Sequence, residues 1–214
     1  MKKRLDVLLS FVKPCRVFAD IGCDHGLVAV GVFKREICEK VIAADVSEGS
    51  LEKTIKLADN EGIDGLITVL SDGFKAIKEP VDQAMIAGMG GEEICKILSE
   101  CENLPERLVL QPMKNAEKLR RLLVKDLRYP VTDDFTFFDG DKFYDVIVAD
   151  RREKPREYRE DDFSFGKDNL FGNEDFKRYA KNLSEIYAAA IEASTDPATK
   201  ENLRSKLNKI AKYL

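Results

Sequence analysis

The sequence predicts an α/β fold with a mostly parallel sheet, and three features of the chain support this. Short β-branched runs alternate with stretches of helical character over residues 1–150 of the 214-residue chain. Repeated strand–helix units place parallel strands in one sheet with helices on both faces. Two later runs flank the turn Asp139-Gly140-Asp141, which is typical of an antiparallel hairpin. Apolar residues over 174–214 recur with helical spacing, so we also expect a small C-terminal helical hairpin.

Residues 1–150 divide into expected strands, helices and a closing hairpin, which together make one domain. The helices are expected at 27–39, 48–60, 73–79 and 91–101. The closing hairpin pairs Val131–Phe138 with Tyr144–Ala149. The parallel strands are the apolar runs Val17–Ile21, Val41–Val46, Ile67–Ser71, Gln83–Ala87 and Leu108–Gln111.

The last third of the chain has a different pattern. Residues 151–173 are charged and contain Pro155, Gly166 and Gly172, and we interpret them as a linker. From 174 to 214 the pattern is helical, with Asp196-Pro197 as the N-cap and first residue of a second helix. The two helices form an amphipathic, coiled-coil-like hairpin. It either only packs on the main domain or contacts a substrate or a second copy, so the chain is a monomer or a weak dimer.

Composition and charge restrict the class of protein. No stretch approaches the roughly 20 apolar residues that span a bilayer. Five cysteines without a CxxC pair and a single histidine disfavour a metal site and fit a reducing cytosol, so we expect a cytoplasmic protein. The basic start, Met1 to Arg4, precedes no small-residue cleavage site, and we expect no signal peptide. A net charge of -4 disfavours strong non-specific nucleic-acid binding but allows a local basic surface.

The first candidate ligand site is the turn after the first strand, Asp20-Ile21-Gly22-Cys23-Asp24-His25-Gly26. Ligands of open α/β sheets bind at the carboxyl ends of strands, where Gly22 lets a ligand approach the backbone closely. Asp20 can hold a cationic group, such as the amino group of a methionine moiety. The dinucleotide fingerprint needs glycine where Asp24 and Leu27 stand, which disfavours NAD. The alternative is a plain connection between a strand and a helix.

Acidic residues also follow the second and third strands. Asp45, with Val46 after it, can bind both hydroxyls of a ribose, or it can cap a helix. Asp72 and Gly73 can hold an adenine amino group, or they can form an ordinary Asp-Gly turn. Acids at three successive strand ends favour a cofactor site over three unrelated turns.

Glycines follow the fourth strand in the run Ala87-Gly88-Met89-Gly90-Gly91. Such a run is costly in backbone entropy, and a flexible loop would carry polar residues where Met89 stands. We therefore expect a loop that approaches the transferred group of the cofactor closely.

The fifth strand and the helix after it supply candidate substrate contacts. Gln111 has donors and acceptors that suit a base edge, although a polar helix start is the alternative. The helix carries a row of cations within about an 80° arc, opposite its apolar side. This basic row either tracks phosphates or is a solvated face. Its members are Lys114, Lys118, Arg121, Lys125 and Arg128, and we add Arg120 to the candidate substrate contacts.

Three motifs together resemble the TrmK-type family of bacterial methyltransferases, which modify N1 of adenine 22 in tRNA. They are Ala19-Asp20-Ile21-Gly22-x-Asp24-His25, Ile86-Ala87-Gly88-Met89-Gly90-Gly91 and Leu110-Gln111-Pro112. The resemblance covers nearly the whole chain, including the strand Lys142-Phe143-Tyr144-Asp145-Val146 and the helical hairpin. It implies a Rossmann-like class I fold, S-adenosyl-L-methionine (SAM) as cofactor and tRNA as substrate. Met113 and Asp45 stand where the family commonly has asparagine and glutamate.

The expected reaction suggests, as a hypothesis, which residues take part in catalysis. Adenine N1 has a free lone pair, so the enzyme mainly positions it against the methyl group. A carboxylate can then stabilise the cationic product and accept its N6 proton. Asp24 is the first candidate for that role and His25 the second, and Tyr144 can stack on a base taken out of its helix. Core or turn roles for His25 and Tyr144 are the alternatives.

Three other functions remain open from the sequence. An NAD-dependent oxidoreductase would explain the sheet and Asp45 but not the missing fingerprint glycines. A SAM- or RNA-binding module without catalysis is a second, because the Asn-Pro-Pro motif of many amino-methylating enzymes is absent. A SAM-dependent enzyme acting on another RNA, a small molecule or a protein is a third.

Overall fold

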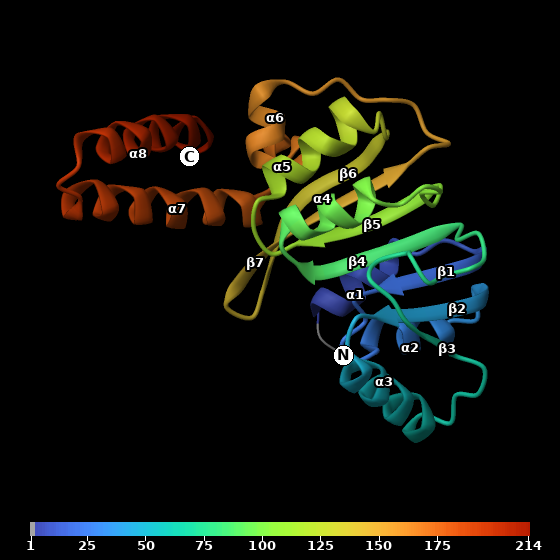
Figure 1. The fold of residues 1–214 in the computed structure, drawn as a ribbon. Coiled ribbons are helices and arrows are strands. Elements are labelled where there is room, and N and C mark those ends of the chain that lie inside the picture. The colour runs from blue at the N-terminus through green and yellow to red at the C-terminus, as the bar shows by residue number, and fades with distance from the viewer. Residues whose placement is uncertain (1–2) are drawn as a thin grey trace.

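The computed structural model describes residues 3–214 and has a seven-stranded sheet at its centre, as Figure 1 shows. The strand order is β3-β2-β1-β4-β5-β7-β6. Strands β1 to β5 are parallel, whereas β7 is antiparallel to both β5 and β6. This confirms the predicted α/β fold, a mostly parallel sheet closed by an antiparallel hairpin. The strands are β1 (Cys15–Ile21), β2 (Cys38–Asp45), β3 (Ile67–Leu70), β4 (Gln83–Met89), β5 (Arg107–Pro112), β6 (Val131–Asp139) and β7 (Lys142–Asp150).

Helices cover both faces of this sheet (Figure 1). On one face lie α1 (Lys3–Ser10), α2 (Leu27–Phe33) and α3 (Glu48–Asn60). The other face carries α4 (Gly91–Ser99) and α5 (Ala116–Arg121), which continues into the π-helical turn η1 (Leu122–Asp126). Alternate residues of a strand point to opposite faces, so Phe18 packs under the first group of helices and Ala19 under the second.

The order of the strands creates a switch point between β1 and β4. The chain runs outward from β1 through β2 to β3 and then returns to place β4 on the other side of β1. Connections leave these two neighbours in opposite directions, which opens a crevice at their carboxyl ends. The register shifts between Ala87 and Met89, as at a bulge, and beyond it Met89 still pairs with Pro112 of β5.

Two expectations about helices are wrong in detail, and one helix is present that was not expected. Residues 73–79 form turns rather than a helix, because the hydroxyl of Ser71 accepts the Ala76 N–H and draws the backbone out of a helical path. Helix α2 ends at Phe33 rather than at residue 39, and Glu36 has a positive φ before β2 begins. Helix α1 is not expected from the sequence. The two residues that precede it, at the start of the basic N-terminal segment, lie outside the described residues.

The C-terminal part begins with short helices that fold onto the edge of the sheet. The segment 151–173, interpreted from the sequence as a linker, contains α6 (Glu160–Phe165) and the 3₁₀ helix η2 (Lys167–Phe171). Asp168 in η2 accepts the backbone N–H of Asp134 in β6 at 2.7 Å. Charged side chains of the segment 151–173 therefore contact the sheet instead of being fully solvated.

A helical hairpin follows, made of α7 (Glu174–Ala193), α8 (Pro197–Ile210) and the 3₁₀ turn η3 (Ala211–Tyr213). Asp196 caps α8 by accepting the Thr199 N–H at 2.8 Å, and Pro197 is the first helical residue, as predicted. The hairpin projects from the domain on the side where the parallel strands end (Figure 1). Among residues 3–214, no helix combines the length and apolar character that a bilayer crossing requires.

Candidate functional site

A cavity of about 790 Å³ opens at the carboxyl ends of β1, β2 and β4. This volume is within the usual range of small-molecule sites. Its apolar walls come from α1, α2 and the strand ends, with Leu5, Leu8, Leu27, Val28 and Met113 among them. Eight of the site residues predicted from the sequence line this cavity together: Asp20, Gly22, Asp24, His25, Asp45, Ala87, Gly88 and Met89.

Asp20 is the buried carboxylate of this cavity, with 3% of its surface exposed. Its Oδ2 accepts the backbone N–H of Ala29 at 3.1 Å, which fixes the side chain against the start of α2. Burial raises the pKa of Asp20 to about 7, and the charge of Asp45 contributes in the same direction. Burial makes the anionic form of this carboxylate unfavourable in the free protein. A cationic ligand group would therefore stabilise the anion strongly.

Asp45 connects the end of β2 to the turn after β1. Its Oδ1 accepts the Ser47 N–H at 2.9 Å, and its Oδ2 accepts the Asp24 N–H at 3.1 Å. Asp24 reaches this position with a φ of 42°, an uncommon backbone conformation for a residue with a side chain. Each Asp45 oxygen keeps a lone pair for another donor, so the carboxylate can take two hydroxyl groups.

Two glycines remove side-chain bulk where β1 and β4 end. A Cβ on Gly22, whose φ is 74°, would lie 1.8 Å from the terminal methyl carbon of Met89. A Cβ on Gly88, whose φ is 84°, would lie 3.3 Å from a guanidinium nitrogen of Arg4. Met89 thus packs across the backbone of the first turn, and this contact requires glycine at position 22.

Asp24 and His25 lie at the exposed part of the same turn. The Asp24 carboxylate is 2.6 Å from Nδ1 of His25 and 3.6 Å from Nζ of Lys53. More than half of each of the Asp24 and His25 side chains is exposed. These two groups are therefore free to meet a second ligand at the cavity, while Asp20 lies beneath them.

The remaining predicted cofactor residues are not in this cavity. Asp72 pairs with Lys75 at 2.5 Å and lines a different cavity of about 630 Å³, between residues 72–81 and the end of α4. Gly73 packs against Ile97, Val46 is 69% exposed, and Gly90 precedes the first residue of α4. The structure does not bring Asp72 together with Asp20 and Asp45.

Arg4 is a charged residue of the site that the sequence did not indicate. It lines the cavity, its Nε donates to Oε1 of Gln111 at 2.9 Å, and its backbone N–H donates to Oδ2 of Asp139 at 2.9 Å. Its guanidinium carbon lies 5.3 Å from the ring centre of Tyr144. Gln111 is fully buried, so it anchors Arg4 instead of meeting a base directly. The predicted stacking residue, Tyr144, is half-buried against Phe137.

The predicted basic row is interrupted by a π-helical turn and by carboxylates. Lys118 lies 3.1 Å from Glu92, Arg121 lies 2.7 Å from both Glu117 and Glu160, and Lys125 lies 3.6 Å from Glu160. Lys114 precedes α5 and has no ion pair within the described residues. The 100° spacing assumed for one continuous helix does not hold beyond Arg121, because the π-helical turn begins there.

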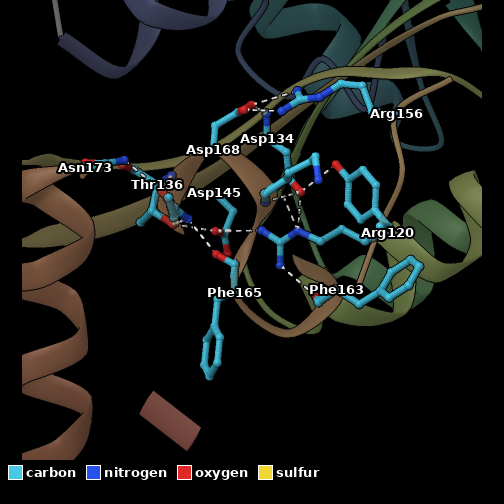
Figure 2. A network of polar contacts seen from close by, with 12 residues as sticks. Arg120, Asp134, Thr136, Asp145, Arg156, Phe163, Phe165, Asp168 and Asn173 are labelled. Atoms are coloured by element: carbon cyan, nitrogen blue, oxygen red, sulfur yellow. Dashed lines mark hydrogen bonds and ion pairs between the residues drawn. The ribbon is translucent and has the colours of Figure 1, made fainter. Parts of the chain in front are cut away.

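The structure places Arg120 away from the exposed basic row, and its contact with substrate stays a prediction. Its guanidinium is buried, with Nε 2.8 Å from Asp134 and Nη2 3.1 Å from Asp145, as Figure 2 shows. Arg120 lies on the side of α5 that faces the sheet, where only a paired charge is tolerated. Its sequence neighbours Leu119 and Leu123 mark that side, but the partner carboxylates on β6 and β7 were not visible from spacing alone.

Comparisons with known proteins identify the family of the chain. The family model of the methyltransferase domain matches residues 1–147. The tRNA (adenine(22)-N(1))-methyltransferase of Bacillus subtilis (strain 168) is 30% identical over 163 residues, 74% of this chain and 68% of that protein. A Streptococcus pneumoniae protein assigned as a tRNA (m1A22) methyltransferase was solved in complex with SAM. It is 26% identical with a TM-score of 0.88, and the match covers 100% of this chain and 99% of that one.

The structure of M. capricolum TrmK, in complex with S-adenosyl-homocysteine, has the same fold. Its TM-score is 0.89 at 20% identity, and the match covers 100% of this chain and 97% of that one. The fold therefore agrees from the sheet through the C-terminal hairpin, and the family model covers the strands and turns that form the cavity. The chain belongs to the methyltransferase-domain family and, within it, to the TrmK-type tRNA (adenine-N1) methyltransferases.

Proposed function

We propose that this chain transfers the methyl group of SAM to N1 of an adenine in tRNA, with position 22 as the expected nucleotide. Family membership supports the reaction, and one structural observation supports its location. Asp20 and Asp45, at the ends of two adjacent strands, line one cavity at the switch point of the sheet. This arrangement matches a ligand with a cationic group at one end and a diol near it.

The residues of the cavity fit this cofactor. Asp20 would hold the amino group, because its buried carboxylate has no cationic partner among the described residues. Asp45 would take the ribose hydroxyls, and Gly22 and Gly88 would let the ligand lie close to the backbone. When bound, SAM supplies an electrophilic methyl group on a sulfonium. Asp72 and Gly73 remain candidates for the adenine amino group, but Asp72 would first have to leave Lys75.

The chain's own groups then act mainly by positioning. N1 of adenine attacks with its lone pair and needs no base, so the acceptor has only to be held beside the Ala87-Gly88-Met89 turn. The methylated base is cationic. The Asp24 carboxylate would stabilise that charge and accept the N6 proton, and His25, hydrogen-bonded to Asp24, would pass the proton towards solvent.

The tRNA would approach over the carboxyl edge of the sheet. Lys114, Lys118, Arg121 and Lys125 are candidates to bind phosphates, since exposed ion pairs are weak and can be exchanged. Tyr144 would stack on the acceptor base, held in place by Arg4 and by Gln111 behind it. We further propose that the protein acts as a monomer or weak dimer in the cytoplasm and needs no metal ion.

Mass spectrometry of tRNA nucleosides tests the reaction. Purified protein is incubated with unmodified tRNA and SAM, and the digest is analysed for 1-methyladenosine. We expect this nucleoside to appear, and Asp45→Ala to reduce its rate of formation. A methyl group on another base or on protein would contradict the proposal. Binding of both SAM and tRNA without any transfer would indicate the inactive binding module, and stabilisation by NAD but not SAM would indicate the oxidoreductase.

A further inference from the structure

A second cavity lies next to the proposed cofactor site. Its volume is about 290 Å³, which is small for a ligand site and suits a single planar group. The turn before α5 and α5 itself, with Glu117 and Arg120, form one wall, and β6, β7, α6 and α7 contribute the rest. Met113 lines both cavities, so a ligand continuous with an occupant of the first can extend into the second.

Aromatic rings form the apolar part of this second cavity. Phe143 from β7, Phe165 from α6 and Tyr179 from α7 all line it, and all three are half-buried. The Phe143 and Tyr179 ring centres are 5.3 Å apart. Aromatic side chains that line a cavity are the surfaces on which nucleobases stack.

Two polar groups of the lining have unused hydrogen-bonding capacity. Both contacts of the Asp145 carboxylate go to its Oδ1, from Arg120 at 3.1 Å and from Thr136 at 2.8 Å (Figure 2). Asp145 Oδ2 accepts no hydrogen bond from any residue of the described range 3–214. The Tyr179 hydroxyl likewise has no hydrogen-bond partner within that range.

The charge of the cavity selects the part of an RNA that can enter. Arg120 is shared between Asp134 and Asp145, so the wall keeps negative charge. A phosphate would be repelled by Asp145, whereas the N–H groups on a base edge would be attracted. Lys114 lies at the same cavity, unpaired within residues 3–214, and can take the phosphate outside.

We infer that this cavity, lined by Asp145, Phe143 and Tyr179, binds a nucleobase that flanks the methylated adenine in the tRNA. The inference rests on the proposed function, and it goes further by assigning a second base-reading site. The base stacks on the aromatic rings. Its N–H edge donates to Asp145 Oδ2, and the Tyr179 hydroxyl completes the contact.

Two variants and a matched control test this with tRNA binding measured by fluorescence anisotropy, without SAM. Asp145→Asn removes the acceptor charge and is expected to weaken binding about tenfold. Tyr179→Phe removes a hydroxyl that has no partner among the described residues, so the fold is retained, and it is expected to weaken binding about threefold. Asp141→Asn removes the same charge from the exposed β6–β7 turn. It should bind tRNA as well as the wild type or better, because one repulsive charge is removed.

Transcripts with one abasic nucleotide identify the base. Each nucleotide flanking the target adenine is replaced in turn. At one position, the wild type should bind the abasic transcript about tenfold more weakly than the intact transcript. Asp145→Asn should bind the abasic and the intact transcripts equally well at that position. The inference is overturned if Asp145→Asn behaves like Asp141→Asn and Tyr179→Phe binds as the wild type does. It is also overturned if every abasic position affects Asp145→Asn as much as the wild type.

The binding and transfer results separate this inference from the proposed function. Wild-type protein that binds tRNA with these variant effects but forms no 1-methyladenosine contradicts the proposed reaction and supports the cavity. Wild-type protein that methylates tRNA while both variants bind normally supports the reaction and overturns the cavity. Wild-type protein that binds no tRNA overturns both.

Discussion

The Asp20 carboxylate combines burial with a position at a ligand cavity, and this makes its charge state sensitive to pH. Burial raises its pKa to about 7, so near neutrality it is only partly ionised in the free protein. Only the anion can hold a cationic amino group. We therefore expect the affinity for S-adenosyl-homocysteine, which keeps that amino group, to rise as pH increases through about 7 and then to level off.

Asp20→Asn should lower that affinity by roughly ten- to a hundredfold at pH 8 and abolish its pH dependence around neutrality. Asparagine keeps an oxygen that can accept the Ala29 N–H, so the turn should stay folded. Calorimetric titration at several pH values measures both effects. An unchanged affinity would show that the amino group is held elsewhere.

The raised pKa of Asp20 makes the stability of the free protein fall as pH increases, whereas it makes the affinity for the ligand rise. The folded-state pKa of Asp20 lies above its ordinary value of 3.8, so the folded protein binds a proton that the unfolded chain releases. This contribution favours folding below about pH 4 and is lost as pH rises towards 7. Asp20→Asn should therefore be more stable than the wild type at pH 8 and similar at pH 4, by urea unfolding without ligand. Equal stability at both values would contradict the burial argument.

Asp24 is exposed and its side chain contacts only surface groups. Its role in catalysis can therefore be tested separately from cofactor binding. Its carboxylate contacts the exposed side chains of His25 and Lys53. We expect Asp24→Asn to lower kcat for tRNA methylation by about tenfold or more while cofactor affinity stays within about twofold. Transfer assays and calorimetry measure the two separately. Full activity with normal binding would assign the charge stabilisation to another group.

At the scale of elements, helix α5 and the π-helical turn η1 that follows it present cations that are paired but exposed. Exposed pairs contribute little to stability, so Lys118 and Lys125 can exchange Glu92 and Glu160 for phosphates. Reversal of both lysines to Glu should weaken tRNA binding. It should also make the slope of log affinity against log salt shallower, by about 0.9 for each phosphate that the protein no longer binds. Lys56→Glu, on exposed α3 at the other face, is the control. The same slope in all three proteins would show that α5 is only a solvated surface.

The elements that could be predicted are those with strong local patterns. The strands through Asp20 and Asp45 are apolar runs that end in an acid, and both appear with their carboxyl ends as expected. The segment 73–79 could not be predicted, because a single hydroxyl contact from Ser71 decides its path. Helix α1 has eight residues, too few for a clear period, and it is stabilised by packing against the sheet rather than by its own sequence.

At the scale of the whole molecule, the site joins segments far apart in the chain. Sheet topology accounts for the meeting of Asp20 with Asp45, because the ends of parallel strands share one edge. Arg4 and Gln111 are 107 residues apart, and nothing in local spacing predicts their hydrogen bond. The partners of Arg120 likewise could not be predicted from local spacing. Its place among the cations of α5 was visible, whereas Asp134 and Asp145 become its partners only through the closing hairpin.

Arg120 also connects the catalytic sheet to the C-terminal part. Besides its two carboxylates on β6 and β7, it donates to the Phe163 carbonyl of α6 at 3.4 Å. Asp134 in turn accepts from Tyr158 and from the Lys167 N–H (2.9 and 3.1 Å). One buried cation thus holds together α5, the hairpin strands and the segment that leads to α7 (Figure 2).

Removal of this cation should loosen that junction. Arg120→Ala leaves two carboxylates without their shared partner, and we expect the free energy of unfolding to fall by about 3–5 kcal/mol. Hydrogen exchange should become faster in α6 and at the start of α7. Arg121→Ala, one position along, removes pairs with two exposed carboxylates and the contact of the guanidinium with the Phe163 ring at 4.7 Å, and it should cost less, about 1–2 kcal/mol. Urea unfolding measures both variants, and equal destabilisation would contradict a special role for Arg120.

A compensating pair distinguishes charge from packing at this junction. Arg120→Met combined with Asp134→Asn removes the buried cation and the more deeply buried anion together, and it keeps much of the volume of both side chains. If the destabilisation of Arg120→Ala comes from uncompensated carboxylates, the double variant should recover most of the stability. If the destabilisation comes from the cavity left by the side chain, Arg120→Met alone should recover as much. Recovery only in the double variant would show that Arg120 orients the C-terminal hairpin electrostatically, and tRNA affinity should then follow stability across the series.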